Sequence, residues 1–200
     1  MPRIAELPIE QWDAALRGMV EGAEVSPLEA KARGIMAHAP HMAMANGAFM
    51  GTAMAGRKLS RRLLELVRLR IAFHNQCRSC MAMRFESALD EGLTEDMVCS
   101  LERPMEADNL SERDKAALAF ADLMATNHFA IGDDTFQELR EHFTQAEVVE
   151  LGIFCGYFIG YGRFLAILDI TEELPAPLQD KSRKIGPWQS SEVVVVHDKG

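Results

Sequence analysis

Helix-start signals recur along the 200-residue chain, and they constrain its fold more strongly than any other feature of the sequence. Ser26-Pro27 combines an N-cap residue with a proline suited to the first helical position. The stretches 111–114 and 144–147 have the spacing of a capping box, the first with Asp in place of Glu or Gln. The chain is also rich in Ala, Leu, Glu and Met, which favour helices. These features predict an all-α body.

The start and stop signals assign a helix to most of the chain up to residue 168. The expected helices span about 9–22, 26–38, 40–52, 60–71, 77–92, a short segment after Thr94, 111–127, 133–142 and 144–168. In the last of these, Gly152, Gly156 and Gly160 recur every four residues. This spacing predicts a helix face without side chains, against which another helix packs closely.

Residues 172–200 differ in composition and are expected to form an extended C-terminal arm after a single helical domain of residues 1–171. The arm contains three prolines, a basic patch between 181 and 184, and four consecutive valines at 193–196. A lone strand has no partner within an all-α body. The valines are therefore expected to pair outside it, with the same arm of another subunit as one candidate. A loosely packed tail remains the alternative.

Composition and charge exclude several classes of function. Apolar residues make up 48% of the chain, which excludes a disordered protein. The net charge of −9, without a basic run, argues against binding to nucleic acid or to an anionic membrane. The N-terminus shows no apolar stretch of a secretory signal, and the uncharged apolar run 151–162 is too short to span a bilayer. We therefore expect a cytoplasmic protein.

Two of the four cysteines, Cys77 and Cys80, form a CxxC motif at an expected helix start. Three residues apart, their side chains lie within one turn, close enough to form a disulfide. A helix N-terminus favours a thiolate, and Arg78 and Arg84 add positive charge. Arg84 follows Cys80 by four residues and is expected on the same helix face. In the cytoplasm such a disulfide is transient and catalytic rather than structural.

Glu65 lies among apolar residues of the helix that begins at Ser60. A carboxyl group on a buried face has a raised pKa and exchanges protons near neutrality. A thiol pair together with such a carboxyl group is suited to thiol–disulfide or peroxide chemistry. The alternative is an ion pair between Glu65 and Arg61, Arg62 or Arg68, all within one helical turn. These arginines, with Arg70, Arg78 and Arg84, gather positive charge near the thiols of an acidic protein.

The glutamate and the CxxC motif, with eleven residues between them, resemble the AhpD-like alkylhydroperoxidase branch of the carboxymuconolactone decarboxylase family. Residues 110–121, residues 143–151 and the Gly-rich helix that ends at 162–164 are similar to the next helices of that family. The resemblance covers about residues 35–170. It implies an AhpD-like helical bundle that assembles as a homo-oligomer, a trimer or a hexamer.

The resemblance also implies a role for each catalytic residue. Cys80 would attack a peroxide as a thiolate and become a sulfenic acid, Cys77 would resolve it by forming the disulfide, and Glu65 would relay protons. The family motif continues with a His four residues after the second cysteine, and here that position is Arg84. Arg does not accept or deliver a proton at neutral pH, but it can stabilise a thiolate or hold an anionic group. His74 is either a substitute in the relay or a capping or surface residue.

Three functions from different classes stay open on the sequence. The first is a thiol-dependent peroxidase or disulfide reductase, an antioxidant enzyme that reduces hydroperoxides and depends on an external thiol reductant such as a lipoylated protein. The second is a decarboxylase or lactone-processing enzyme, which needs an acid/base pair and an anion-binding Arg such as Arg84. The third is a non-catalytic or redox-sensing member that has lost the motif His. The chain has neither GxGxxG nor a P-loop motif, so no bound cofactor is expected.

The spacing of His74, Cys77 and Cys80 is also that of metal ligands. His38 or His41 would have to supply a fourth ligand. Because the chain has no second CxxC motif, a redox pair is the favoured interpretation, and no metal site is expected.

The other cysteines and the methionines have simpler expected roles. Cys99 and Cys155 are interpreted as core cysteines. Arg163 is either a snorkelling residue or a buried partner for a carboxylate. Several methionines are expected to pack between helices or to line an adaptable apolar pocket: Met42, Met44, Met50 and Met54.

Overall fold

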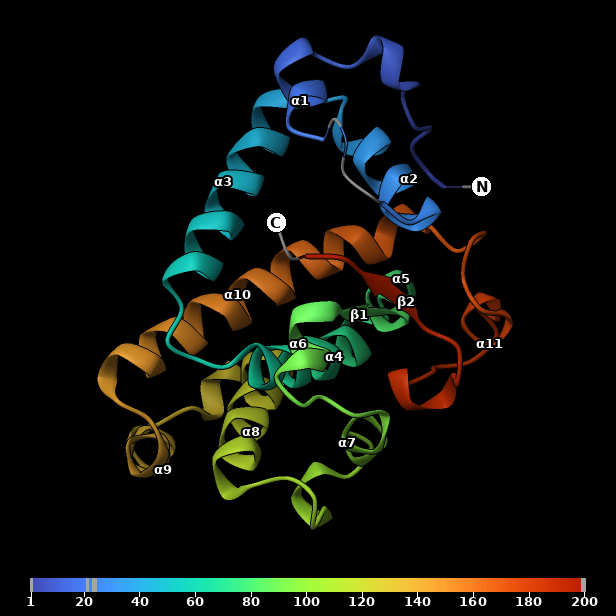
Figure 1. Cartoon of the computed structure of the whole chain (residues 1–200). Helices are drawn as coiled ribbons and strands as arrows, with labels where there is room; N and C mark the ends of the chain where they lie inside the picture. The colour runs from blue at the N-terminus through green and yellow to red at the C-terminus, as the bar shows by residue number, and fades with distance from the viewer. Residues whose placement is uncertain (1, 21, 23–24, 199–200) are drawn as a thin grey trace.

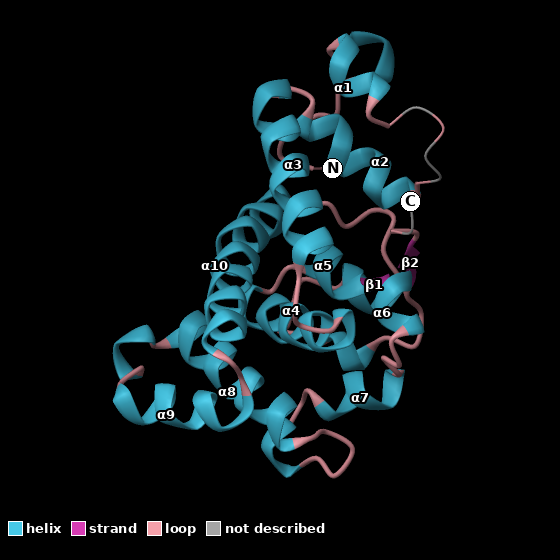
Figure 2. Cartoon of the chain, turned by 60° about the vertical axis from the view of Figure 1, so that its left-hand side comes forward, coloured by secondary structure: helices cyan, strands magenta, loops and turns pink. Residues whose placement is uncertain are grey.

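Three packed helices form the centre of the structure, a computed structural model that describes residues 2–20, 22 and 25–198 (Figures 1 and 2). They are α4 (Arg61–Asn75), α8 (Glu112–Thr126) and α10 (Gln145–Leu168), and each contacts the other two. Nine of the 15 residues of α4 are buried, so α4 is the central helix. The all-α fold class is confirmed.

The other helices surround this centre. The longer ones are α1 (Ala14–Gly18), α2 (Pro27–Met36), α3 (Pro40–Gly56), α5 (Arg78–Ala82), α6 (Glu86–Asp90), α7 (Glu95–Ser100), α9 (Asp133–His142) and α11 (Ala176–Gln179). Single 3-10 turns lie at η1 (Ile9–Gln11), η2 (Pro104–Glu106), η3 (His128–Ala130) and η4 (Pro187–Gln189).

Side-chain caps confirm five of the predicted helix starts. The hydroxyls of Ser60 and Thr94 accept a hydrogen bond from the backbone N–H three residues later. Ser26, Ser111 and Thr144 each form a full capping box. Because a cap acts within its own first turn and contributes about 1 kcal/mol, its signal can be recognised without knowledge of the rest of the fold.

Two predicted helices are interrupted. The range 9–22 contains η1 and α1 as separate pieces, because the Asp13 carboxylate accepts hydrogen bonds from the N–H groups of Ala15 and Leu16 and so starts a new helix. The range 77–92 contains α5 and α6 with a strand, β1 (Met83–Phe85), between them. The second interruption has a tertiary cause, which is the pairing of β1 with a distant strand.

That distant strand, β2 (Val194–Val196), comes from the valine run and pairs in parallel with β1. Met83 lies opposite Val194 and Phe85 lies opposite Val196. In Figure 1 the red β2 lies beside the green β1. The prediction that the valines have no partner within their own chain was wrong, because the segment after α5 leaves the helical conformation and supplies one.

The rest of the arm also packs against the body. Leu174, Leu178 and Ile185 are buried in the same apolar cluster as Cys77 and Cys80. The arm therefore covers the thiol segment from outside, and a loosely packed tail does not describe residues 174–196.

One side of α10 is open. By length and composition alone α10 could cross a membrane, a property it shares with core helices of soluble proteins. A Cβ added at Gly152, Gly156 or Gly160 would meet no described atom within 4 Å, so the predicted close helix contact is not made by the described part of this chain. The same helix exposes large apolar side chains: Val149, Ile153, Phe164 and Ile167.

Candidate active site

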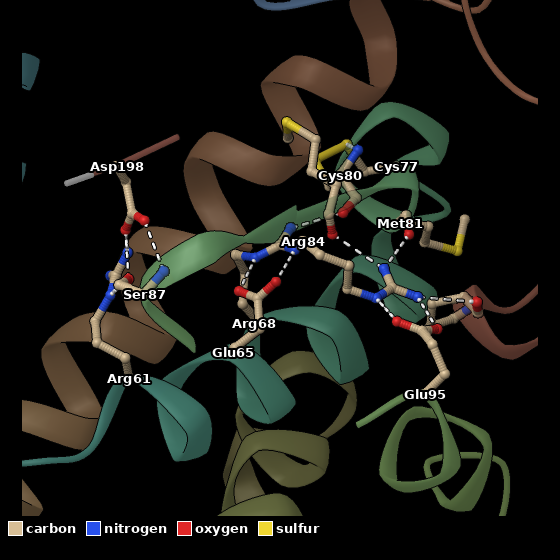
Figure 3. Close-up of polar contacts among 12 residues, drawn as sticks. Arg61, Glu65, Arg68, Cys77, Cys80, Met81, Arg84, Ser87, Glu95 and Asp198 are labelled. Carbon is tan, nitrogen blue, oxygen red and sulfur yellow. Dashed lines mark hydrogen bonds and ion pairs between the residues drawn. A yellow bond between two sulfur atoms is a disulfide. The ribbon is translucent and has the colours of Figure 1, made fainter. Parts of the chain in front are cut away.

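The central helix places Glu65 and Arg68 in the interior, one turn apart. Glu65 is 3% exposed and Arg68 is 8% exposed. The Nε and Nη2 groups of Arg68 each donate to one carboxylate oxygen of Glu65, both at 2.7 Å (Figure 3). Such a bidentate pair fixes both side chains. The predicted burial of Glu65 is confirmed, and the ion pair with Arg68 is the arrangement found.

Arg68 also ties α4 to the segment that carries the thiol pair. Its Nη1 donates to the carbonyl oxygen of Cys80 at 2.6 Å, and its Nη2 donates to that of Met83 at 2.9 Å. One guanidinium therefore serves a carboxylate and two backbone carbonyls. It holds the end of α5 at a fixed position relative to Glu65.

The thiol pair lies at the turn between α4 and α5. After α4, Gln76 adopts a left-handed conformation with φ of 50°, and Cys77 then caps α5. The sulfurs of Cys77 and Cys80 are joined in a disulfide, so the CxxC spacing brings them together as predicted. Cys77 is fully buried, whereas Cys80 lines a cavity. Cys80 is thus the sulfur that a small molecule in the cavity would meet.

The cavity beside Cys80 has a volume of about 620 Å³, which suits a small organic molecule. Residues of α3, α4, α6, α10 and β1 form its walls. Glu65 and Arg68 line it together with Cys80. Its apolar wall consists mainly of methionine and aromatic side chains: Met50, Met54, Met83, Phe85, Tyr157, Phe158 and Tyr161.

Arg84 lies behind β1 and does not line the cavity. Its side chain is fully buried, and its Nε and Nη2 donate to the Glu95 carboxylate at 2.8 and 3.1 Å. Its other contacts are the carbonyl oxygens of Met81, Met83 and Pro187, at 2.8, 3.0 and 3.4 Å (Figure 3). Arg84 therefore anchors β1 to α7 and to the arm.

The expectation that Arg84 shares a helix face with Cys80 was wrong, because α5 ends at Ala82 and a strand follows. Side chains alternate between the two faces of a strand. Met83 and Phe85 line the cavity, and Arg84 between them points to the opposite side. The residue at the motif position is thus outside the cavity, whereas Arg68 lines it and donates to the carbonyl oxygen of Cys80.

Five of the six arginines predicted around the thiols are neutralised by a carboxylate, and Arg78 is held by backbone carbonyl oxygens. Arg78 donates to the carbonyl oxygens of Leu178 and Arg183 in the arm. The other five arginines are in ion pairs: Arg61 with Asp198, Arg62 with Asp114, Arg68 with Glu65, Arg70 with Asp122, and Arg84 with Glu95.

His74 pairs with Asp122 of α8 and does not line the cavity. Its Nε2 lies 2.7 Å from Asp122 Oδ1, which also accepts from Arg70. Burial acts to raise the pKa of the Asp122 carboxyl, but the hydrogen bonds from His74 and Arg70 outweigh it, so the net shift is downward. Within residues 2–20, 22 and 25–198, no three His, Cys, Asp or Glu side chains are grouped to hold a metal ion.

The arm reaches the cavity through Asp198. Its carboxylate accepts hydrogen bonds from the N–H of Ser87 at 2.9 Å and from the Ser87 hydroxyl at 2.5 Å, and it forms an ion pair with Arg61. All three residues line the cavity. Burial acts to raise the pKa of the Asp198 carboxyl, but the Ser87 hydrogen bonds and the Arg61 charge outweigh it and lower the pKa. Sequence reasoning missed this contact because it depends on where the arm folds back.

Two tyrosines of the cavity wall were also missed. Tyr157 and Tyr161 lie one turn apart on α10, with ring centroids 5.2 Å apart. Burial raises the pKa of both, and the Tyr157 hydroxyl donates to Asn46 Oδ1 at 2.9 Å. They are the only tyrosines of the chain. Their four-residue spacing in the Gly-rich helix was a usable signal.

The two remaining cysteines differ in their surroundings. Cys155 is buried as predicted, and burial raises the pKa of its thiol to about 12. The core assignment of Cys99 was wrong, because α7 buries Val98 and presents Cys99 to solvent.

The roles expected for the methionines are found for three of the four, Met44 by packing against Trp12, Leu16 and Ala37. The buried carboxylate partner expected as one alternative for Arg163 is not found among the described residues. Met50 and Met54 line the cavity, while Met42 is 61% exposed. Arg163 is neither buried nor paired with a carboxylate; it donates to the carbonyl oxygen of Ala125 and to Asn75 Oδ1.

Comparison with known proteins finds a family model that matches the part of the chain from α3 to α8, which includes the thiol pair. Residues 40–123 match the model of the carboxymuconolactone decarboxylase family. The chain is 40% identical over 87 residues to the uncharacterized protein Rv2313c of Mycobacterium tuberculosis, and 28% identical over 94 residues to the uncharacterized protein YdfG of Bacillus subtilis. These matches cover 44% and 46% of this chain, but only 31% and 64% of the two relatives. The chain thus matches about a third of the mycobacterial protein.

Three solved structures share the fold. A putative antioxidant defence protein AhpD of Agrobacterium tumefaciens has a TM-score of 0.60 and 21% identity, with 70% of this chain and 94% of that chain covered. The alkylhydroperoxidase AhpD core of a peroxidase-related protein of Ralstonia eutropha has a TM-score of 0.67 and 18% identity, covering 90% and 96%. The debrominase Bmp8, as a cysteine-to-alanine variant with 2,3,4-tribromopyrrole, has a TM-score of 0.62 and 18% identity, covering 90% and 95%.

Proposed function

We propose that the protein is a thiol-dependent peroxidase that reduces hydroperoxides through Cys77 and Cys80. The proposal starts from two findings: residues 40–123 match the carboxymuconolactone decarboxylase family model, and the fold is AhpD-like. One observation carries the proposal. Cys80 lines a cavity of about 620 Å³, and its bonded partner Cys77 is fully buried and does not line that cavity. This arrangement suits one sulfur that meets the substrate and a second that resolves the product.

The proposed reaction has two steps. The Cys80 thiolate attacks the terminal oxygen of the hydroperoxide ROOH, an S–O bond forms, the O–O bond breaks, and the alkoxide takes up a proton to leave as ROH. The Cys77 thiol then attacks the sulfenic sulfur of Cys80, and hydroxide leaves with a proton as water. Two electrons pass from the thiol pair to the peroxide, and the product is the Cys77–Cys80 disulfide.

Glu65 is the proposed proton acceptor for the Cys80 thiol and the donor to the departing alkoxide. It lines the same cavity as Cys80, and Arg68 fixes its orientation through two hydrogen bonds. A second residue in the relay, as the family's motif His would supply, is not needed if Glu65 exchanges protons with Cys80 through water in the cavity. Arg84 has an anchoring role in this proposal.

Regeneration of the thiols requires an external reductant, and we propose a dithiol such as a lipoylated protein, with the cytoplasm as the compartment. Thiol–disulfide exchange with a dithiol restores both cysteines and leaves the reductant as a disulfide. The open face of α10 supports a homo-oligomer, a trimer or a hexamer, since Gly156 has no neighbour there and apolar side chains flank it. Light scattering after size exclusion tests this, and Gly156→Leu should lower the mass observed.

A second candidate is reductive dehalogenation of an aromatic ring, which the aromatic wall of Phe85, Tyr157 and Tyr161 favours. The Cys80 thiolate would take the halogen, the ring carbanion would take a proton, and Cys77 would displace halide to form the disulfide. The decarboxylase or lactone-processing alternative loses Arg84 as its anion-binding residue, because that side chain is bonded to Glu95 behind β1. A non-catalytic redox sensor remains the alternative if no turnover is found.

The test follows peroxide consumption and protein mass. Peroxide consumption is measured with cumene hydroperoxide and dithiothreitol together. Protein mass is measured separately, after one addition of cumene hydroperoxide to reduced protein from which dithiothreitol has been removed, because dithiothreitol would reduce the disulfide and the sulfenic acid again. The native protein should consume peroxide and lose two hydrogens in forming the disulfide. Cys77→Ser should stop at a sulfenic acid on Cys80, and Cys80→Ser should consume no peroxide. Cys99→Ser, which removes an exposed cysteine outside the cavity, is the matched control and should retain the native rate.

Equal consumption by Cys80→Ser and native protein would contradict the assignment of Cys80 as nucleophile. A tribromopyrrole substrate in the same assay, with bromide release as the readout, distinguishes the second candidate from the first.

A further inference from the structure

The cavity wall holds a second polar site besides the thiol site. Arg61 of α4 contributes its guanidinium, and Ser87 of α6 contributes its backbone N–H and its hydroxyl. We call these two residues the cradle. In this structure the cradle holds the carboxylate of Asp198 from the arm (Figure 3). The Glu65–Arg68 pair is drawn between the cradle and the cysteines in that view.

The cradle is held in place by contacts that do not involve Asp198. Arg61 Nε donates to the Ser87 hydroxyl oxygen at 2.7 Å, and the Arg61 backbone N–H donates to Glu91 Oε2 at 2.6 Å. The Arg61 guanidinium also lies over the Phe85 ring, 5.2 Å from its centroid. An arginine fixed on three sides is preorganised for a carboxylate, because it loses little side-chain freedom on binding.

The cradle matches a carboxylate in charge and in number of donors. One oxygen of Asp198 accepts the Ser87 N–H, and the other accepts the Ser87 hydroxyl and the Arg61 guanidinium. The side chain of Arg61 is 10% exposed and that of Asp198 is 18% exposed, so the pair is largely shielded from water. Without Asp198, no carboxylate within the described residues would neutralise the Arg61 guanidinium.

The occupant belongs to a segment that a ligand can compete with. Asp198 lies two residues beyond β2, which is a strand of three residues. The side chain of its neighbour His197 is 50% exposed, and its Nδ1 lies 3.2 Å from Glu86 Oε2. Asp198 therefore competes with a free ligand for the cradle as if it were present at an effective concentration of about millimolar order.

We propose that the cradle is a carboxylate-binding subsite of the cavity and that Asp198 occupies it in competition with an acidic substrate. The identity of the reactive group rests on the proposed peroxidase function. On that basis the substrate is an organic hydroperoxide that carries a carboxylate. Its carboxylate binds Arg61 and Ser87, and its apolar body lies along the methionine and aromatic wall that leads to Cys80.

The first experiment measures binding without turnover. Hexanoate and hexan-1-ol, which share an apolar chain and differ in the carboxylate, are titrated calorimetrically into the oxidised full-length protein. Asp198→Ala should tighten hexanoate binding by at least about tenfold and leave hexanol binding unchanged. Adding Arg61→Gln should abolish the gain. Glu192→Ala, which removes the same charge from an exposed position on the same arm, is the matched control and should have no effect.

Asp198→Asn keeps the shape of the side chain and serves as the second variant if the alanine variant unfolds. It should also tighten hexanoate binding, by a smaller factor than Asp198→Ala. Unchanged hexanoate binding in both variants, an equal gain for hexanol, or a gain that persists with Arg61→Gln would each overturn the subsite.

The second experiment measures turnover of a fatty-acid hydroperoxide and of its methyl ester. Asp198→Ala should raise kcat/KM for the acid and not for the ester. An equal rise for both would show that the arm only opens the cavity, which overturns the carboxylate subsite. If neither compound is consumed by any variant, the proposed peroxidase function fails, while the hexanoate titration still decides the subsite on its own.

Discussion

The guanidinium groups of Arg68 and Arg84 lie on opposite sides of β1 and bind different partners. Arg68 lines the cavity, where it binds Glu65 and the carbonyl oxygen of Cys80. Arg84 lies behind the strand, where it binds Glu95 and carbonyl oxygens. Arg84 occupies the motif position and Arg68 does not, yet only Arg68 faces the thiol site. Whether an arginine takes part in this site is therefore decided by the side of β1 on which its guanidinium lies, and not by its position in the sequence motif.

The two ion pairs also differ in burial. The Arg68 and Glu65 side chains are 10% and 3% exposed, so neither charge is well solvated. The Arg84 side chain is fully buried, but that of Glu95 is 48% exposed. Loss of the arginine leaves a buried carboxylate in the first pair and a partly solvated carboxylate in the second, so the two arginine substitutions are expected to cost unequal amounts of stability.

The largest effect is expected from Arg68→Met. Glu65 would be left as a buried carboxylate without a partner, which costs about 3–5 kcal/mol of unfolding free energy. Urea denaturation of the oxidised protein measures this. The double variant Glu65→Gln with Arg68→Met should recover part of the loss, because the uncompensated charge is gone. If the double variant is no more stable than Arg68→Met alone, the loss of unfolding free energy comes from lost packing and not from the unpaired charge of Glu65.

A smaller loss, about 2–3 kcal/mol, is expected from Arg84→Met, because backbone carbonyls behind β1 lose their donor while Glu95 can turn to water. Arg84→His should lose similar stability and should not raise peroxide consumption, since its side chain would still point away from the cavity. Faster peroxide consumption by Arg84→His would show that a side chain at position 84 affects the thiols, and it would contradict the distinction drawn between Arg68 and Arg84.

The two thiols of the reduced protein should react with an alkylating reagent at different rates. N-ethylmaleimide at pH 7 should label Cys80 at least about tenfold faster than Cys77, because only Cys80 lines the cavity. Peptide mass spectrometry reads the order. Cys155 is the internal control and should stay unlabelled, since burial raises the pKa of its thiol to about 12. Faster labelling of Cys77 would reverse the assignment of nucleophile and resolving residue.

The smallest expected effect is the pH-dependent contribution of Asp198, the residue of the arm that lines the cavity, to the stability of the protein. The pKa of the Asp198 carboxyl is lowered from 3.8 in the folded protein, because the Ser87 hydrogen bonds and the Arg61 charge outweigh burial. Its contribution to stability is therefore present above about pH 4 and is lost as pH falls through the lowered pKa. The unfolding free energy of the native protein should exceed that of Asp198→Asn by at most about 1 kcal/mol at pH 6. The difference should shrink progressively as the pH falls below about 4. A difference that stays constant with pH would exclude the charge as its source.

Features that act within one turn were predictable from the sequence. The caps at Ser60, Ser111 and Thr144 fixed helix starts, and the three-residue spacing of Cys77 and Cys80 fixed the sulfur pair. Each depends on contacts within the same helical turn, so no other part of the fold can alter it.

Features that depend on distant contacts were not predictable. The segment after Ala82 reads as helix, yet it forms β1 because β2 pairs with it. That pairing turned Arg84 away from Cys80 and brought Asp198 to Ser87. Local pattern also missed the exposure of Cys99, since which side of α7 faces the core is decided by the helices packed against it.

The parallel pairing of β1 with β2 has a consequence for the order of folding. The two strands lie at opposite ends of more than half the chain, so the contact between them is among those that close late and slowly. Cys77 and Cys80 are neighbours within one turn long before that, as soon as α5 forms. A folding intermediate with the helices in place and the arm still free would therefore already have a competent thiol pair but an unfinished binding wall. In such an intermediate the thiol pair would be in place before Asp198 completes the cavity wall.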